Sequence, residues 1–430
     1  MNGLEEGSIK DKNMESPFID PVQGDKMLGA FRVASGIKGA VVIIHAPVGC
    51  HWGVNFIERL SSVKTNACIS ALRERSVVFG GEDNLRKTIE IILKNRKRRY
   101  LILLAGSVPS IIGEDWQGVI DSLGFDLHTI AIDCGGFLGR MGDGIEECLG
   151  AICQWVDEPP AKKERSGPLV NLIGLQRDVI KGEANIKEIK RMLGLIGVRV
   201  NSVFPPSSIT EIKRASAADL NIVLGWGTRL AHAMEEKWGI PWISLREYPY
   251  GFAGTQRFLN AVARSLKGEE IYYGYLEKAI ERERRKVLRI LRQAHIYLPA
   301  LYGIPVAVCG DLPQAIGMAR FLYQEVGVSI EAMHITSSPD SDDKASLPWD
   351  MCPEILVQDS WHRFKSIVEK KKIAMLFGTD LENLISKSMD IPLILYSYPT
   401  TSRIALTSSP YIGFRGVPTL IEEIVNHVIR

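Results

Sequence analysis

The sequence predicts an α/β protein made of three Rossmann-like units, each with a parallel sheet flanked by helices. Short runs of β-branched residues alternate along the chain with longer segments of helical period. This alternation is typical of parallel sheets that helices cover on both faces. The chain has 430 residues, which is too long for one ordinary hydrophobic core. The apolar runs also fall into three groups, so we expect three units in series.

The first unit is expected over residues 21–160, after a polar and acidic segment, 1–20, that we expect to be disordered or extended. A helix is expected at 82–95, where Leu85, Ile89 and Ile92 follow a helical spacing. The strands predicted in this unit are AVVII (40–44), YLILLA (100–105) and HTIAID (128–133).

The second and third units are expected over 167–268 and 301–430, the latter including a C-terminal segment. A polar, Pro-rich stretch at 157–168 predicts a linker before the second unit. A connecting helix is expected at 269–300; its RERRK cluster includes acidic neighbours and apolar residues at helical intervals, which indicates a solvated face. The strands predicted in these units are 169–174, 198–204, 220–225, 241–245, 304–310, 328–335, 354–358, 373–378 and 391–396.

Composition excludes several classes of protein. The net charge of +2 gives no electrostatic reason to expect nucleic acid or a membrane surface as a partner. No apolar run approaches the roughly 18 residues of a membrane span, and the N-terminus lacks the apolar core of a signal peptide. Seven cysteines, an odd number, are spread thinly along the chain, unlike a secreted disulfide scaffold. We therefore expect a cytoplasmic protein.

Common catalytic motifs are absent from the sequence. There is no G-x-x-x-x-G-K-[ST] and no strand followed by G-x-G-x-x-G, so no bound nucleotide is expected in this chain. H-E-x-x-H, C-x-x-C and G-x-S-x-G are missing as well. Candidate functional residues must therefore be sought singly, at the ends of strands.

Cys50 is the main candidate from this search. It follows the predicted strand 40–44 in the turn HAPVGC (45–50), and active groups of open α/β sheets collect beyond the carboxyl ends of strands. The alternative is a buried structural cysteine, which is the usual fate of an isolated thiol.

Several segments in order resemble the nitrogenase component 1 family. That family includes the nitrogenase molybdenum-iron protein, its cofactor-assembly scaffold and the light-independent protochlorophyllide reductases. The likeness to its β-type subunits extends over about 400 residues. The segments that carry it are HAPVGC (45–50), VFGG (78–81), SVPSIIGEDW (107–116), MEEKWGIPW (234–242), YPYGFAGTQRFL (248–259) and IPLILYSYPTTSRIALTSSPYIGFRG (391–416).

The resemblance implies an iron-sulfur cluster at a subunit interface. Complete members of the family place three cysteines at it; one matches Cys50, but the other two positions fall near Asp25 and Ser107. Iron in a cluster prefers thiolate, and four ligands are usual for a [4Fe-4S] cluster. The resemblance thus implies that a paralogous α-type subunit supplies three cysteines and this chain the fourth. Ligation by the carboxylate of Asp25 or the hydroxyl of Ser107 is the alternative.

Other residues of the expected cluster loops would have supporting roles. Pro47 would stiffen the turn, and Gly49 would let the backbone approach the cluster. His45 would fix the turn by hydrogen bonding, with ligation of the metal as the alternative. His51 follows the thiol and would cover the cluster. Cys134, at the end of another strand, would face the cluster pocket or play a structural part. The middle unit lacks the cysteine that an iron-molybdenum cofactor needs, so none is expected in this chain.

The function that the resemblance implies is that of an oxidoreductase subunit, inactive alone, in an α2β2 heterotetramer. An ATP-dependent iron-sulfur reductase would deliver low-potential electrons, which the interface cluster would relay to a substrate. One alternative is a non-catalytic scaffold on which a metal cluster is assembled. Another is a homodimeric tetrapyrrole reductive cyclase.

Overall fold

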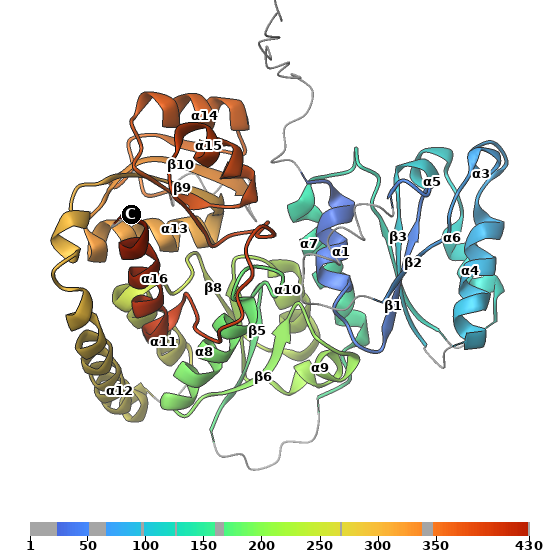
Figure 1. The fold of residues 1–430 in the computed structure, drawn as a ribbon. Helices are drawn as coiled ribbons and strands as arrows, with labels where there is room; N and C mark the ends of the chain where they lie inside the picture. The colour runs from blue at the N-terminus through green and yellow to red at the C-terminus, as the bar shows by residue number, and fades with distance from the viewer. Residues whose placement is uncertain are drawn as a thin grey trace, which may run out of the picture.

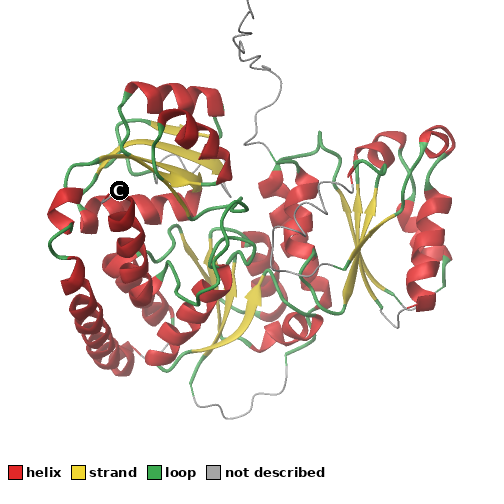
Figure 2. Cartoon of the chain, in the orientation of Figure 1, coloured by secondary structure: helices red, strands yellow, loops and turns green. Residues whose placement is uncertain are grey.

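The computed structural model describes residues 24–50, 66–95, 99–124, 127–159, 167–266, 269–337 and 347–428. Its described part contains three separate parallel sheets flanked by helices (Figures 1 and 2), which confirms the predicted fold class. The predicted N-terminal segment 1–20, most of the linker and His51 lie outside the described residues.

The first unit has a parallel sheet of order β2-β1-β3-β4. Alternate residues of its buried strands face opposite helical layers: Val42 and Ile44 pack with α1 and α7, whereas Val41 and Ile43 pack with α4 and α6. Its strands are β1 (Ala40–His45), β2 (Ala67–Ile69), β3 (Tyr100–Ala105) and β4 (His128–Asp133). Its helices are α1 (Lys26–Ala34), α3 (Glu74–Phe79), α4 (Glu82–Asn95), α5 (Ser107–Ile112), α6 (Trp116–Ser122), α7 (Met141–Ile152) and η1 (Cys153–Trp155).

Helices α1 and α7 touch backbone to backbone because both have glycine at the crossing. A Cβ on Gly29 would lie 1.8 Å from the carbonyl oxygen of Met141, and one on Gly144 would lie 1.9 Å from that of Lys26. Any side chain at either position would separate the helices. This crossing fixes the start of α1, and with it Asp25, beside the first sheet.

The second unit has a parallel sheet of order β6-β5-β7-β8 and lies between the other two units in Figure 1. Its strands are β5 (Leu169–Ile173), β6 (Arg199–Phe204), β7 (Leu220–Leu224) and β8 (Trp242–Leu245). Its helices are α8 (Gly182–Leu195), α9 (Ile209–Lys213), η2 (Arg214–Ala217), α10 (Thr228–Trp238) and α11 (Gly251–Ser265).

The third unit has a five-stranded parallel sheet of order β11-β10-β9-β12-β13. One hydrophobic core runs from the second unit into this one. Its strands are β9 (Pro305–Asp311), β10 (Ser329–Ser337), β11 (Ile355–Val357), β12 (Met375–Gly378) and β13 (Leu393–Leu395). Its helices are α13 (Leu312–Phe321), the π-helical η5 (Leu322–Val326), α14 (Trp361–Lys370), η7 (Asp380–Glu382), α15 (Asn383–Met389) and α16 (Gly413–Val428).

The predicted connecting helix at 269–300 is too long. Helix α12 (Glu269–Leu291) ends earlier and is followed by two 3-10 turns, η3 (Arg292–Ala294) and η4 (Leu298–Leu301). Pro299 lies in the first turn of η4, where its missing N–H costs nothing, but it could not sit inside a continuous α-helix. No described helix combines the length and the apolar character needed to cross a membrane.

Candidate functional site

Cys50 lies beyond the carboxyl end of β1, at one edge of the first sheet. All six residues of β1 are buried, and the chain then turns so that the Cys50 N–H donates to the Pro47 carbonyl at 3.0 Å. The turn runs beside residues 70–72, and the Leu72 N–H donates to the Ala46 carbonyl at 3.1 Å. Cys50 is exposed, and Val48 beside it is 57% exposed. The structure therefore presents this thiol on the surface and does not pack it in the core.

Three other predicted site residues come to the same edge. Asp25 caps α1 by accepting a hydrogen bond from the Leu28 N–H at 2.9 Å. Ser107 begins α5 directly after β3, and its hydroxyl accepts from the Gly136 N–H at 2.9 Å. Cys134 follows β4. The strands β1, β3 and β4 are parallel neighbours, so the segments that follow them meet at one edge of the sheet.

The two thiols at this edge differ in their surroundings. Although Cys50 is exposed, the neighbouring protein atoms partly desolvate its thiol, and this desolvation and the Asp25 carboxylate raise the pKa of Cys50 above its ordinary value. Cys134 is 1% exposed within a hydrophobic cluster, and burial raises its pKa to about 12. Both groups are therefore protonated at neutral pH in the isolated chain. Cys134 is packed as a core residue, whereas Cys50 faces outward.

His45 is held inside the protein by two hydrogen bonds. Its side chain is fully buried; Nδ1 lies 2.7 Å from the Ser70 hydroxyl and Nε2 lies 2.5 Å from a Glu114 carboxylate oxygen. Because both ring nitrogens are used, His45 supports the turn and is not free to bind a metal. With Glu114 ionised, Nε2–H donates to it and Nδ1 accepts from Ser70.

Burial of His45 predicts a pH-dependent stability. Burial lowers its pKa below the ordinary value of about 6.5, although Glu114 opposes the shift. Below about pH 6.5 the unfolded chain therefore binds a proton that the folded chain does not. The free energy of unfolding should decrease as the pH is lowered, until the pH reaches the pKa of His45 in the folded protein. The contribution to the slope is at most about 1.4 kcal/mol per pH unit. Urea unfolding of the wild type and of His45→Gln at several pH values below about 6.5 measures how the free energy of unfolding changes with pH. Equal changes in the two proteins would contradict the prediction.

Pro47 and Gly49 shape the outer part of the turn. Pro47 pairs with Leu72 as an isolated parallel bridge, which extends the contact between β1 and β2. A Cβ on Gly49 would meet nothing within 4 Å, so no described part of this chain requires glycine there. The space beside Gly49 is open toward the surface, on the side where Cys50 is exposed.

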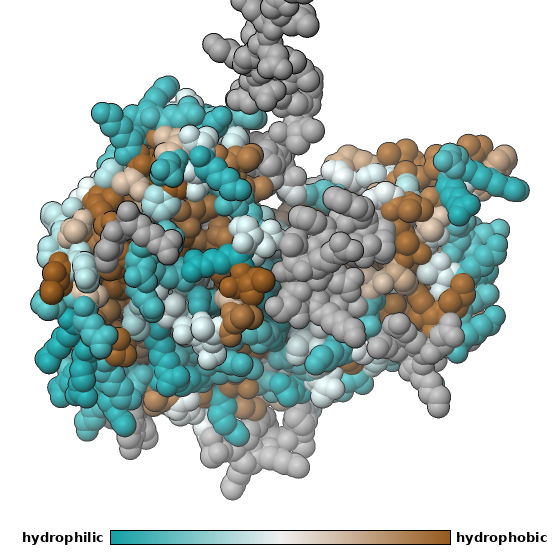
Figure 3. Space-filling model, in the orientation of Figure 1, coloured by the Kyte–Doolittle hydropathy of each residue, from teal (hydrophilic) through white to brown (hydrophobic). Residues whose placement is uncertain are grey.

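Exposed apolar side chains surround this edge of the sheet. Helix α3 exposes Val78 (73%) and Phe79 (80%), α5 exposes Ile111 (69%), and the loop after β4 exposes Phe137 (61%). Helix α3 contacts α5, and the loop after β4 contacts Ser107 at the start of α5. Apolar residues accordingly gather along the upper edge of the first unit in Figure 3, where Figure 1 places α3 and α5. We call Val78, Phe79, Ile111 and Phe137 the apolar rim.

The described part of the chain does not supply a complete metal site. Among its residues, no group of three or more histidine, cysteine, aspartate or glutamate side chains is placed to hold a metal ion. Cys50 is a single exposed thiol, and a [4Fe-4S] cluster takes four ligands. By themselves, the residues that the structure describes do not make up a cluster site, and Cys50 fits one ligand position of a cluster that needs further ligands.

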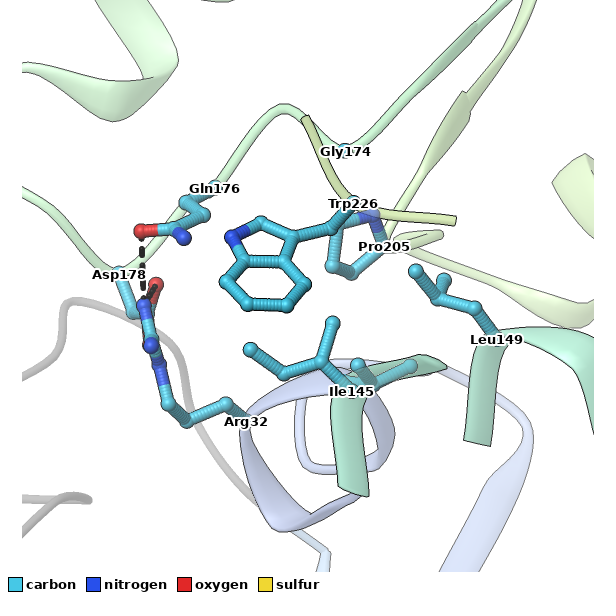
Figure 4. Close-up of a pocket in the computed structure, with 9 residues that line it drawn as sticks. Arg32, Ile145, Leu149, Gly174, Gln176, Asp178, Pro205 and Trp226 are labelled. Atoms are coloured by element: carbon cyan, nitrogen blue, oxygen red, sulfur yellow. Dashed lines mark hydrogen bonds and ion pairs between the residues drawn. The ribbon is translucent and has the colours of Figure 1, made fainter. Parts of the chain in front are cut away.

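A second group of polar residues joins the three units around Arg32 of α1. The Arg32 guanidinium pairs with Asp178 through Nε at 2.6 Å and Nη2 at 3.1 Å, and donates to Gln176 at 2.8 Å (Figure 4). Its Cζ also lies 3.5 Å from the ring centroid of Tyr398 in the third unit. Burial by itself lowers the pKa of Arg32, but Asp178, with smaller contributions from Tyr398 and Asp311, raises it by more in total. The net shift of the pKa is upward, so Arg32 keeps its charge.

Gln176 carries this network into the third unit. Its amide donates to Asp311 at 2.8 Å, and Asp311 also accepts from the Ser337 hydroxyl. The cavity beside the network has a volume of about 10 Å³, enough for about one water molecule. The residues that line it are Arg32, Val33, Ile145, Leu149, Gly174, Gln176, Asp178, Pro205 and Trp226 (Figure 4).

Reasoning from the sequence missed Glu114, Arg32 and Asp178. The signal for Glu114 was present, since it is the first acidic residue after the Ile-Gly of SVPSIIGEDW. Arg32 and Asp178 are 146 positions apart, and no local pattern joins them. Only their contact in the folded chain shows that they act together.

Comparisons of this chain with protein families, with individual proteins and with solved structures agree with one another. The family model described as nitrogenase component 1 type oxidoreductase matches residues 26–429. The chain is 25% identical to a light-independent protochlorophyllide reductase subunit of Zygnema circumcarinatum, covering 94% of this chain and 82% of that protein. It is also 25% identical to the nitrogenase molybdenum-iron protein beta chain of Frankia alni, covering 98% and 84%. A structure titled "Nitrogenase Cp1 at pH 6.5" superposes with a TM-score of 0.79 at 20% identity, over 96% of this chain and 93% of that chain, which concerns the fold alone.

Proposed function

Because the chain belongs to the nitrogenase component 1 type oxidoreductases, we propose that it is the β-type subunit of a nitrogenase-like reductase, with Cys50 as one ligand of an iron-sulfur cluster at the interface with a paralogous α-type subunit. The observation that carries the proposal is the exposed Cys50 thiol, which lies at the same edge of the first sheet as the apolar rim. The relatives from Zygnema and Frankia are named as subunits of a reductase and of a nitrogenase, which favours an enzyme over an assembly scaffold.

The number of metal-binding groups explains why the proposed cluster would need a second chain. Cys50 would give one thiolate, and the α-type subunit would give the three others that a [4Fe-4S] cluster takes. Asp25 and Ser107 stand at the same edge as oxygen donors, but Ser107 already accepts a hydrogen bond from Gly136 and Asp25 from Leu28. Iron would have to displace the Cys50 proton, so loading would be stronger at higher pH.

The same features indicate what each chain would contribute to the reaction. When bound, the cluster would supply low-potential one-electron transfer, and this chain would hold one corner of it and exclude water with the apolar rim. The electrons would come from an ATP-dependent iron-sulfur reductase. Substrate would bind in or near the α-type subunit. All seven cysteines are free thiols, which suits a reducing compartment such as the cytoplasm.

Iron analysis of the complex tests this proposal. The chain would be co-expressed without oxygen with the α-type subunit, and iron and acid-labile sulfide would be counted. We expect about four irons per heterodimer for the wild type and loss of more than about half of them in Cys50→Ala. Cys68→Ala is the matched control, because Cys68 is partly buried in β2 and its thiol donates to the Val42 carbonyl. Unchanged iron in Cys50→Ala would refute ligation by this residue.

A further inference from the structure

We infer that Glu114 is a positioning residue for the proposed cluster site, because one buried carboxylate joins the segments that carry Cys50 and most of the apolar rim. The inference rests on the proposed function. It adds a residue that touches neither the cluster nor the partner in that proposal, and it assigns that residue a measurable effect on the cluster.

The Glu114 carboxylate ties three segments together. Glu114 is 8% exposed. Its Oε2 accepts a hydrogen bond from His45 Nε2 at the end of β1, and its Oε1 accepts one from the Gly81 N–H, both at 2.5 Å. Its own N–H donates to the Pro109 carbonyl of α5 at 3.1 Å. The turn to Cys50 begins at His45, α3 ends just before Gly81, and α5 carries Ile111. A shift of this carboxylate would therefore move the thiol and the rim relative to each other.

The link from His45 to Cys50 is short and stiff. His45 is also held by Ser70, whose N–H donates to the Ile44 carbonyl at 3.0 Å. Two residues further on, the Leu72 N–H holds the Ala46 carbonyl, and the bridge between Pro47 and Leu72 continues the contact. The His45 ring thus anchors the base of the turn from which Cys50 projects.

Gly81 shows how closely the carboxylate is fitted. A Cβ at this position would lie 2.3 Å from Leu72 Cδ2 and 2.8 Å from Glu114 Oε1. Real Cβ atoms do not approach this closely, so a side chain here would displace Leu72 or Glu114. This close approach gives a physical reason for the second glycine of the sequence VFGG, beyond turn flexibility.

A carboxylate suits this position better than an amide. It accepts at both oxygens, so the Gly81 N–H and the His45 Nε2–H are both satisfied. In Glu114→Gln the amide nitrogen would donate toward His45 Nε2, so the ring proton of His45 would have to lie on Nδ1. The Ser70 hydroxyl would then have to accept from Nδ1–H, with its own proton turned away. In Glu114→Ala both donors would be left buried without partners, so the segments that they hold would lose their common anchor.

The test compares Glu114→Gln and Glu114→Ala with Glu146→Gln in the anaerobic complex with the α-type subunit. Glu146 is a matched control: it is 6% exposed and accepts from the backbone N–H groups of Gly227 and Arg229, at the contact between α7 and α10. The readouts are iron retained against the chelator bipyridyl, the electron paramagnetic resonance spectrum of the reduced complex, and thermal unfolding of the free subunit.

Loss of residues that orient metal ligands typically weakens metal binding about 10- to 100-fold. We expect loss of this size in Glu114→Ala, partial recovery and an altered resonance spectrum in Glu114→Gln, and wild-type iron and spectrum in Glu146→Gln. A merely structural role would lower the unfolding temperature of Glu114 and Glu146 variants alike and leave the spectrum unchanged, which would overturn the inference. If Cys50→Ala lost its iron while both Glu114 variants kept wild-type iron and spectrum, the inference alone would fail. If Cys50→Ala kept its iron, the proposed function would fail.

Discussion

Replacing Arg32 with methionine should destabilise the subunit by about 3–5 kcal/mol, because removal of one partner leaves a buried charge unpaired. The Arg32 side chain is 3% exposed and that of Asp178 is 14% exposed. The substitution keeps the aliphatic stem but leaves the Asp178 carboxylate and the Gln176 amide oxygen without their donor. Since these groups join the first two units, and Tyr398 adds the third, urea unfolding of the wild type and of Arg32→Met measures the loss for the whole subunit.

A double substitution separates the loss of the ion pair from the loss of packing. Arg32→Met combined with Asp178→Leu should recover most of the lost free energy, because apolar residues of similar volume often replace a buried ion pair without loss. Arg285→Met is the control: Arg285 pairs with Glu281 on α12, but their side chains are 74% and 51% exposed. Such a pair contributes about 0–1 kcal/mol. A loss in Arg32→Met as small as that of the control would show that the network is not a structural joint.

The second large effect should fall on assembly. Phe79→Asp is expected to weaken binding to the α-type subunit at least about 100-fold, which corresponds to about 2.8 kcal/mol. Buried aromatic anchors contribute about 2 kcal/mol or more at interfaces, and an aspartate there would be desolvated without a partner. Phe79 is 80% exposed in the free chain, so its replacement should leave the unfolding temperature of the free subunit unchanged.

Leu406→Asp provides the matched control for this measurement. Leu406 is 93% exposed, in the loop between β13 and α16, on a unit other than the one that carries the rim. Sedimentation of the mixed subunits gives the dissociation constant of each complex. Equal weakening by both substitutions would show a general loss of solubility and would contradict the assignment of the rim as the interface.

The regular elements could be predicted well because their signals are local. Every predicted strand is present, with ends within two residues of the prediction, and the helix at 82–95 has the bounds of α4. Strand β2 was missed because it has three residues, all only partly buried, and too few positions to show an alternation. The helix predicted at 269–300 was too long because helical periodicity continues past Leu291 while the backbone has already changed to 3-10 turns.

The sequence by itself determined the α/β class, the series of three units and the place of Cys50 beyond a buried strand, since these follow from residue type and spacing along the chain. Only the tertiary structure decided which side chains meet. It shows that Cys50 is exposed while Cys134 is buried, that Glu114 holds His45 and Gly81, and that Arg32 reaches Asp178 across 146 positions. Hydrogen bonds and ion pairs act over about 3 Å in space, and residues distant in sequence come that close only after the chain has folded.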